Sequence, residues 1–196
     1  MTSGKWQNLI LVGAVAALAC GVAMAQNQPT APAGGVTLAP HPLTEYQPVT
    51  DAVLRNPDPS DWIMMRGNYQ GWGYSALDQV NKTNVKGLQL VWSRVMESGV
   101  NEATPIVYKG VMFLGNTGDV IQALDAASGE LLWQYRRVLP TRDPARSHWG
   151  QRKRSVFLYE DKVYTLTWDN AVVALDAKTG KVVWETSRGE DGFVTN

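Results

Sequence analysis

An all-β fold built from repeated blades, a β-propeller, is predicted by three observations. The segment ALDAASGELLW at residues 123–133 returns as ALDAKTGKVVW at residues 174–184, a spacing of 51 residues. The match extends without a gap back to Val107 and Leu158, and short apolar stretches alternate with turn residues in both copies. Repeats of about 40–50 residues made of short strands are typical of propellers, in which each repeat is one four-stranded blade.

Each repeat is predicted to hold two hairpins. Residues 111–114 and 163–167 are strand-like, and the turn residues 116–119 and 169–170 follow them. Those turns contain Asn, Asp and Gly, which tolerate the positive φ that hairpin turns require. The alternative to a true repeat is that two ordinary hairpins are similar by chance.

The second turn of each repeat carries the residues that recur in phase. Asp125 and Asp176 are expected to accept hydrogen bonds from nearby backbone amides. Gly129 and its counterpart Gly180, 51 residues later, are expected to adopt a left-handed conformation. Trp133 and Trp184 return on the next strand as large apolar plates, and we expect them to pack between adjacent blades.

Composition indicates an ordinary globular protein. The 196 residues are 44% hydrophobic and 18% charged, with 18 basic and 18 acidic side chains. This balance argues against disorder and against a nucleic-acid-binding surface that covers the whole protein.

Residues 1–25 are predicted to be a secretory signal peptide. Lys5 precedes an apolar run over residues 9–22, and Ala-Met-Ala at residues 23–25 offers a cleavage site before Gln26. A permanent membrane anchor is one alternative, although the run is shorter than the ~20 residues that span a bilayer. Lipidation of Cys20, the only cysteine, is another. Cleavage after Ala25 leaves no stable membrane span and no cysteine for a disulfide or a CxxCH haem site.

Residues 26–45 are rich in Pro, Ala, Thr and Gly and are predicted to form a flexible or extended lead-in. Thr50 is a candidate N-cap for a short helix that runs to Leu54 and ends before Pro57. Globular structure is therefore expected to begin near Thr50, and residues 46–196 are assigned to the propeller.

A family resemblance is carried by residues 61–92. These contain Asp-Trp at 61–62, YSALDQVN at 74–81, NVKGL at 84–88 and a tryptophan at 92, expected on a strand. NEATP at 101–105 and KRS at 153–155 continue the pattern. The chain resembles the N-terminal part of the pyrroloquinoline quinone (PQQ)-dependent alcohol dehydrogenases of the methanol/ethanol dehydrogenase type.

The resemblance implies an eight-bladed propeller, incomplete in this chain, that holds PQQ on its axis beside a calcium ion. Such enzymes oxidise a small alcohol in the periplasm and pass the electrons to a cytochrome c. The resemblance gives Glu102, Arg154 and Thr195 as contacts of the quinone. It places the calcium ligands and the catalytic aspartate beyond Asn196.

The chemistry of PQQ suits these residue types. Its carboxylates and quinone oxygens can be held bidentately by a guanidinium such as that of Arg154, and oriented by carboxyl and hydroxyl groups. A solvated arginine at 154 and a surface glutamate at 102 are the alternatives. Where many family members have two adjacent cysteines over the quinone, this chain has His148 and Trp149. Trp149 is predicted to cover the ring by stacking, or else to pack on neighbouring strands.

A basic run ends in the Lys-Arg-Ser segment. It contains seven cations and a single acid, Asp143, which gives a local charge of 7 − 1 = +6 with His148 neutral. A solvated loop is the common meaning of such a run, and attraction of an anionic cofactor or an acidic cytochrome surface is a sharper one. The run lacks the interleaved aromatics of a nucleic-acid site, so no nucleic-acid partner is expected. The cations are Arg136, Arg137, Arg142, Arg146, Arg152, Lys153 and Arg154.

Two other functions stay open at this point. A propeller with the same tryptophan repeats can be a non-catalytic interaction scaffold of the outer-membrane assembly type, which needs neither Glu102 nor Arg154. A sugar or polyol dehydrogenase that uses the same cofactor is the second. Hydrolase and zinc motifs such as HExxH, GxSxG or a P-loop do not occur in the sequence.

Overall fold

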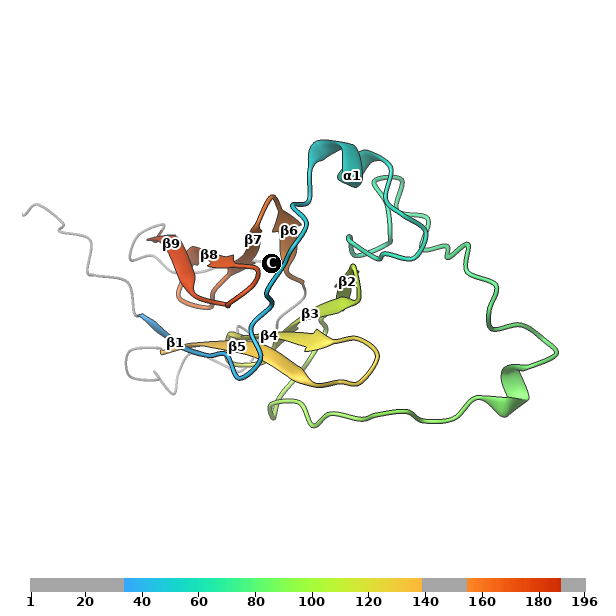
Figure 1. The fold of residues 1–196 in the computed structure, drawn as a ribbon. Coiled ribbons are helices and arrows are strands. Elements are labelled where there is room, and N and C mark those ends of the chain that lie inside the picture. Colours follow the sequence, from blue (N-terminus) through green and yellow to red (C-terminus); the bar gives the residue numbers. More distant parts are fainter. Residues whose placement is uncertain (1–33, 139–154, 188–196) are drawn as a thin grey trace, which may run out of the picture.

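The computed structural model describes residues 34–138 and 155–187, which form two antiparallel sheets. The first sheet has the strand order β1-β5-β4-β3-β2 and the second the order β6-β7-β8-β9 (Figure 1). Sheet 1 consists of β1 (Gly35–Leu38), β2 (Ile106–Tyr108), β3 (Val111–Asn116), β4 (Val120–Asp125) and β5 (Leu131–Arg137). Sheet 2 consists of β6 (Phe157–Tyr159), β7 (Lys162–Leu166), β8 (Ala171–Asp176) and β9 (Val182–Ser187).

The predicted repeat is confirmed in the strand pairing. Strands β2–β5 and β6–β9 are two successive meanders, each the four-stranded unit expected of a blade. The register shifts between Ala123 and Leu124 in the first unit, and between Ala174 and Leu175 in the second. These irregularities lie 51 residues apart, so the two units agree in detail as well as in order.

The turn chemistry expected from the sequence is also confirmed. Asp119 and Asn170 have φ of 55° and 64° in the β3–β4 and β7–β8 turns. The carboxylate of Asp125 accepts hydrogen bonds from the backbone amides of Ala127 and Ser128, and that of Asp176 accepts one from the backbone amide of Thr179. These interactions fix the chain direction at both ends of each hairpin.

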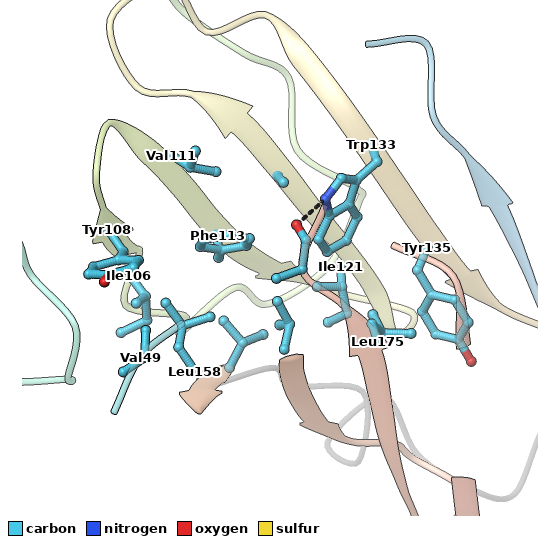
Figure 2. Close-up of a cluster of buried hydrophobic side chains, with 14 of the residues drawn as sticks. Val49, Ile106, Tyr108, Val111, Phe113, Ile121, Trp133, Tyr135, Leu158 and Leu175 are labelled. Carbon is cyan, nitrogen blue, oxygen red and sulfur yellow. Dashed lines mark hydrogen bonds between the residues drawn. The ribbon is translucent and has the colours of Figure 1, made fainter. Parts of the chain in front are cut away.

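A tryptophan from the first unit docks on the second. Trp133 in β5 is fully buried, and its indole Nε1 donates to the carbonyl oxygen of Ala177 at 2.9 Å (Figure 2). Gly180 has a φ of +67°, and a Cβ there would lie 2.4 Å from Cε3 of Trp133. The indole thus lies flat against the backbone of the β8–β9 turn, where only glycine fits.

The same docking occurs one step earlier in the chain. Trp92 donates from Nε1 to the carbonyl oxygen of Ala126 at 3.2 Å, and a Cβ on Gly129 would lie 2.6 Å from its Cδ2. Trp184, in phase with Trp133, is 41% exposed, and its ring centroid lies 5.9 Å from that of Tyr164. Two of the three tryptophans therefore join successive structural units.

The segment around Trp92 differs from its prediction, because it is not a strand. No strand among the described residues pairs with it, so its backbone lacks the partner that a strand requires. The chain from residue 66 to 104 contains no strand and holds one 3₁₀ turn, η1 (Val85–Gly87), which lies away from both sheets before the chain returns to sheet 1 (Figure 1).

Ordered structure begins earlier than the sequence indicates. Within the predicted lead-in, β1 adds a fifth strand to sheet 1, with Gly35 opposite Arg137 and Leu38 opposite Gln134. The following residues run on to sheet 2, where the amide of Leu43 donates to the carbonyl of Lys178 at 3.0 Å. We call residues 35–51 the N-terminal strap, because they lie along both sheets.

Helix α1 (Asp51–Arg55) follows the strap and confirms the predicted cap. The Thr50 side chain accepts a hydrogen bond from the amide of Val53 at 3.4 Å, and the helix ends at Asn56. Trp62 then pairs with Val107 at the edge of β2.

The core lies between the two sheets. Phe113, Ile121 and Trp133 from sheet 1 meet Val173 and Leu175 from sheet 2, and all five are fully buried. Facing apolar surfaces of two sheets are the interface expected between neighbouring blades.

Candidate functional site

The strand directions bring several polar segments to one end of both sheets. Strands β2 and β6 begin at this end, and the β3–β4 and β7–β8 turns lie here as well, because neighbouring strands are antiparallel. We call it the Glu102 end, since Glu102 precedes β2 by four residues. The two docked tryptophans contact turns at the opposite end.

Glu102 is exposed at this end, whereas Ile106, the first residue of β2, is buried. The chain before Glu102 contacts the β3–β4 turn. Thr117 donates from its backbone amide to Oδ1 of Asn101 at 3.0 Å, and its hydroxyl lies 3.1 Å from the carbonyl oxygen of Val100. Glu102 is therefore held next to sheet 1.

The β3–β4 and β7–β8 turns are joined across the boundary between the two blades. Oδ2 of Asp119, in the β3–β4 turn, accepts a hydrogen bond from the amide of Trp168 at 2.6 Å. Thr167 and Asp169, beside Trp168, are linked by a hydrogen bond of 2.6 Å. The Glu102 end is thus a continuous polar network from sheet 1 to sheet 2.

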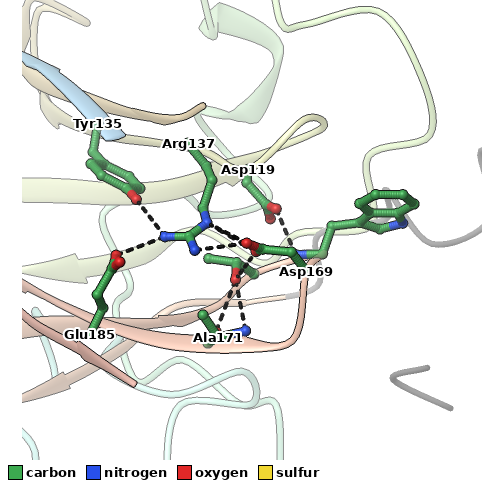
Figure 3. Close-up of polar contacts among 8 residues, drawn as sticks. Asp119, Tyr135, Arg137, Asp169, Ala171 and Glu185 are labelled. Atoms are coloured by element: carbon green, nitrogen blue, oxygen red, sulfur yellow. Dashed lines mark hydrogen bonds and ion pairs between the residues drawn. The ribbon is translucent and has the colours of Figure 1, made fainter. Parts of the chain in front are cut away.

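Arg137 is the centre of that network (Figure 3). Its side chain is fully buried at the end of β5, and it binds carboxylates from two elements of sheet 2. Nε and Nη2 contact the carboxylate of Asp169 at 2.9 and 2.7 Å, and Nη1 lies 2.8 Å from Oε2 of Glu185. Bidentate pairing of this kind fixes the orientation of both partners.

The ionisation of this cluster follows from its contacts. Burial alone would raise the pKa of Asp169, but hydrogen bonds from Arg137 and Thr167 outweigh it and hold the pKa below its ordinary value. Burial likewise opposes the charge on Arg137, and its hydrogen bonds to Asp169, Tyr135 and Glu185 raise its pKa instead. The arginine is charged at all relevant pH values.

A pH dependence of stability follows from Asp169. Because its pKa is lowered by folding, its contribution is complete above the unfolded value of about 3.9 and disappears as the pH falls through the folded value. We expect Asp169→Asn to lower the thermal midpoint at pH 7 clearly more than at pH 3. The exposed Asp78→Asn is the control. An equal effect of Asp169→Asn at both pH values would show that this carboxylate is not the titrating group.

The structure describes only part of the predicted site. Glu102 lies in the described region, whereas Trp149, Arg154 and Thr195 lie outside it. The assignment of Arg136 and Arg137 to a solvated basic loop is wrong, because both belong to strand β5 and Arg137 is buried in ion pairs. Strand alternation was the available signal: Trp133, Tyr135 and Arg137 share one face, and that face is buried.

Within residues 34–138 and 155–187, no group of three or more His, Cys, Asp or Glu side chains is arranged to hold a metal ion. The helices in the same ranges are all too short or too polar to cross a bilayer.

Comparison with known proteins identifies relatives over most of the chain. The family model described as "PQQ: Glucose/ethanol/alcohol dehydrogenase, beta-propeller domain" matches residues 62–194. The chain is 39% identical over 139 residues to a quinohemoprotein alcohol dehydrogenase of Comamonas testosteroni, a match that covers 69% of this chain and 20% of the relative. It is 44% identical over 117 residues to a 1-butanol dehydrogenase (cytochrome c) of Thauera butanivorans, which covers 59% of this chain and 17% of the relative.

A solved structure gives the same picture. A europium-containing methanol dehydrogenase superimposes with a TM-score of 0.63 at 28% identity, over 71% of this chain and 25% of the other. The chain spans about a fifth of the length of the curated relatives that it matches.

Proposed function

Because the chain belongs to the PQQ-dependent glucose/ethanol/alcohol dehydrogenase β-propeller family, we propose that it is the N-terminal part of an alcohol dehydrogenase. The whole enzyme oxidises an alcohol to an aldehyde or ketone and passes the electrons to a cytochrome c. The match of the family model over residues 62–194 is the observation that carries this proposal. It favours an enzyme over an interaction scaffold, and the names of the relatives favour an alcohol over a sugar or polyol.

We assign the anionic, planar cofactor to the Glu102 end. Glu102 is exposed there, where the polar edge of a ligand can reach it. Arg154 stands in the sequence just before β6, as Glu102 stands before β2, so each precedes the first strand of its unit. PQQ, when bound, supplies the acceptor for the two electrons that leave the alcohol.

Each residue has a separate task in this proposal. Arg154 clamps a carboxylate of PQQ through its planar guanidinium, and Glu102 orients another polar edge by hydrogen bonding. Trp149 covers one face of the ring by stacking, and Thr195 adds a polar contact. Calcium and the catalytic aspartate are assigned to parts of the enzyme beyond Asn196.

The same proposal includes a periplasmic location. The charged, apolar and small-residue regions of residues 1–25 support export with cleavage after Ala25. A cytochrome c acceptor is consistent with that compartment, and a relative is named for it.

Titration of the metal-reconstituted, PQQ-free enzyme with PQQ tests the cofactor residues. Arg154→Lys keeps the charge and loses the two-pronged geometry, so we expect affinity to fall roughly ten- to a hundredfold. Glu102→Ala is expected to weaken binding as well. Binding is followed by quenching of protein fluorescence, and turnover of ethanol, 1-butanol and glucose is measured separately with a dye acceptor.

Arg142→Lys is the matched control, since it makes the same change elsewhere in the basic run. If Arg154→Lys titrates like the wild type, Arg154 is an ordinary loop residue. If the wild type does not bind PQQ, the interaction scaffold becomes the better assignment. Turnover of glucose in preference to both alcohols would replace the alcohol by a sugar.

A further inference from the structure

The chain that leads to Glu102 contacts sheet 1 at Trp92 and, through Glu97, at Arg136, but no strand of the described residues pairs with it. Leu90, Val91 and Val95 are 83%, 81% and 95% exposed. An extended segment of this kind does not by itself fix the position of a side chain that follows it. Contacts closer to Glu102 therefore decide how firmly the chain on its N-terminal side is held.

Thr117 supplies that contact. It is 5% exposed, and its hydroxyl lies 3.1 Å from the carbonyl oxygen of Val100 and 3.2 Å from Oδ1 of Asn101. Its backbone amide donates to the same Oδ1 at 3.0 Å. Gly99 has a φ of +132°, and a Cβ there would lie 2.6 Å from Cγ2 of Thr117. The threonine methyl group thus lies against the backbone of Gly99.

The turn that carries Thr117 is itself well anchored. On one side, Nδ2 of Asn116 donates to Oε1 of Gln122 at 2.7 Å within sheet 1. On the other, Asp119 accepts the hydrogen bond from Trp168 of sheet 2. Through Thr117, residues 99–101 are therefore attached to a turn that is anchored in both blades.

Glu102 lies between two fixed points. Thr117 holds Asn101, the residue before it, and the buried Ile106 begins β2 four residues after it. We propose that Thr117 is a positioning residue for Glu102, which sets the carboxylate in the place where it meets the quinone. The role rests on the proposed function, because it requires that Glu102 contacts PQQ.

Thr117→Val removes the hydroxyl and keeps the shape and the backbone amide. We expect the affinity of the metal-reconstituted enzyme for PQQ to fall roughly three- to tenfold, the effect of one hydrogen bond. Thr117→Ser keeps the hydroxyl and should restore most of the binding. Thr37→Val is the matched control, since it removes a hydroxyl that donates to the carbonyl of Gly180 at 2.9 Å, at the opposite end of the sheets.

Two further measurements separate positioning from general stability. In a Glu102→Ala background, Thr117→Val should have no additional effect on PQQ affinity, because Thr117 acts through the missing carboxylate. In the PQQ-free protein, amide hydrogen exchange of residues 99–102 should be faster in Thr117→Val than in the wild type, and unchanged in Thr37→Val.

The results distinguish this role from the proposed function. Wild-type affinity in Thr117→Val, or an equal loss of affinity with and without Glu102, would overturn the positioning role and leave the proposed function standing. Unchanged hydrogen exchange at residues 99–102 would overturn it too. A wild-type enzyme that does not bind PQQ would overturn both.

Discussion

Replacing Gly180 by alanine is expected to lower the free energy of unfolding by about 2–5 kcal/mol. The positive φ of 67° is unfavourable for alanine, and the new Cβ would lie 2.4 Å from Cε3 of Trp133. The indole cannot move aside without loss, because it is fully buried and donates to the carbonyl of Ala177. The measurement is urea unfolding of the full-length protein, followed by circular dichroism.

Gly110→Ala separates the two causes of this effect. Gly110 also has a positive φ, +79°, but a Cβ there would meet no heavy atom within 4 Å. We expect it to show the cost of the backbone conformation alone, about 1 kcal/mol. Equal losses in the two variants would mean that the close contact between Trp133 and the turn contributes nothing.

Arg137→Met is the second substitution with a large expected effect, a decrease of about 3–5 kcal/mol in the free energy of unfolding. The arginine is fully buried between the blades, and its removal leaves the carboxylates of Asp169 and Glu185 together without their cation. Methionine fills much of the volume, so the loss reports the broken ion pairs more than a cavity. The same urea titration measures it.

Arg136→Met is the matched control in the adjacent position. Arg136 pairs with Glu97 at a site where both side chains are about two-fifths exposed, and such pairs contribute about 1 kcal/mol or less. Adding Asp169→Asn and Glu185→Gln to Arg137→Met should recover part of the loss, since both uncompensated charges disappear. If Arg137→Met costs no more than Arg136→Met, the buried cluster does not hold the blades together.

The elements that the sequence predicted best are those encoded locally. The second turn of each unit has its Asp and Gly within a few residues of each other, and Trp133 follows at a fixed distance. The repeat then showed that these features belong to the same architecture. Strand β1 was not predicted, because its partner β5 lies about a hundred residues away and its four residues are too few to stand out, with Val36 and Leu38 exposed.

The site was predictable only in part, for a similar physical reason. Glu102 was found through a resemblance, whereas its contact with Thr117 depends on how β3 and β4 bring residue 117 back beside residue 101. Arg137 was misassigned because its neighbours in sequence are basic. Its partners Asp169 and Glu185 become adjacent only when sheet 2 packs on sheet 1.

The N-terminal strap has a consequence for the order of folding. Gly35 can pair with Arg137 only after the first hairpin unit exists, and Leu43 can bond to Lys178 only after the second exists, because each partner belongs to a later part of the chain. Contacts of such long sequence separation form late, while the hairpins of β2–β5 and β6–β9 close locally. The first residues of the propeller to be synthesised are therefore among the last to find their places. Once there, the strap joins two blades that have already formed.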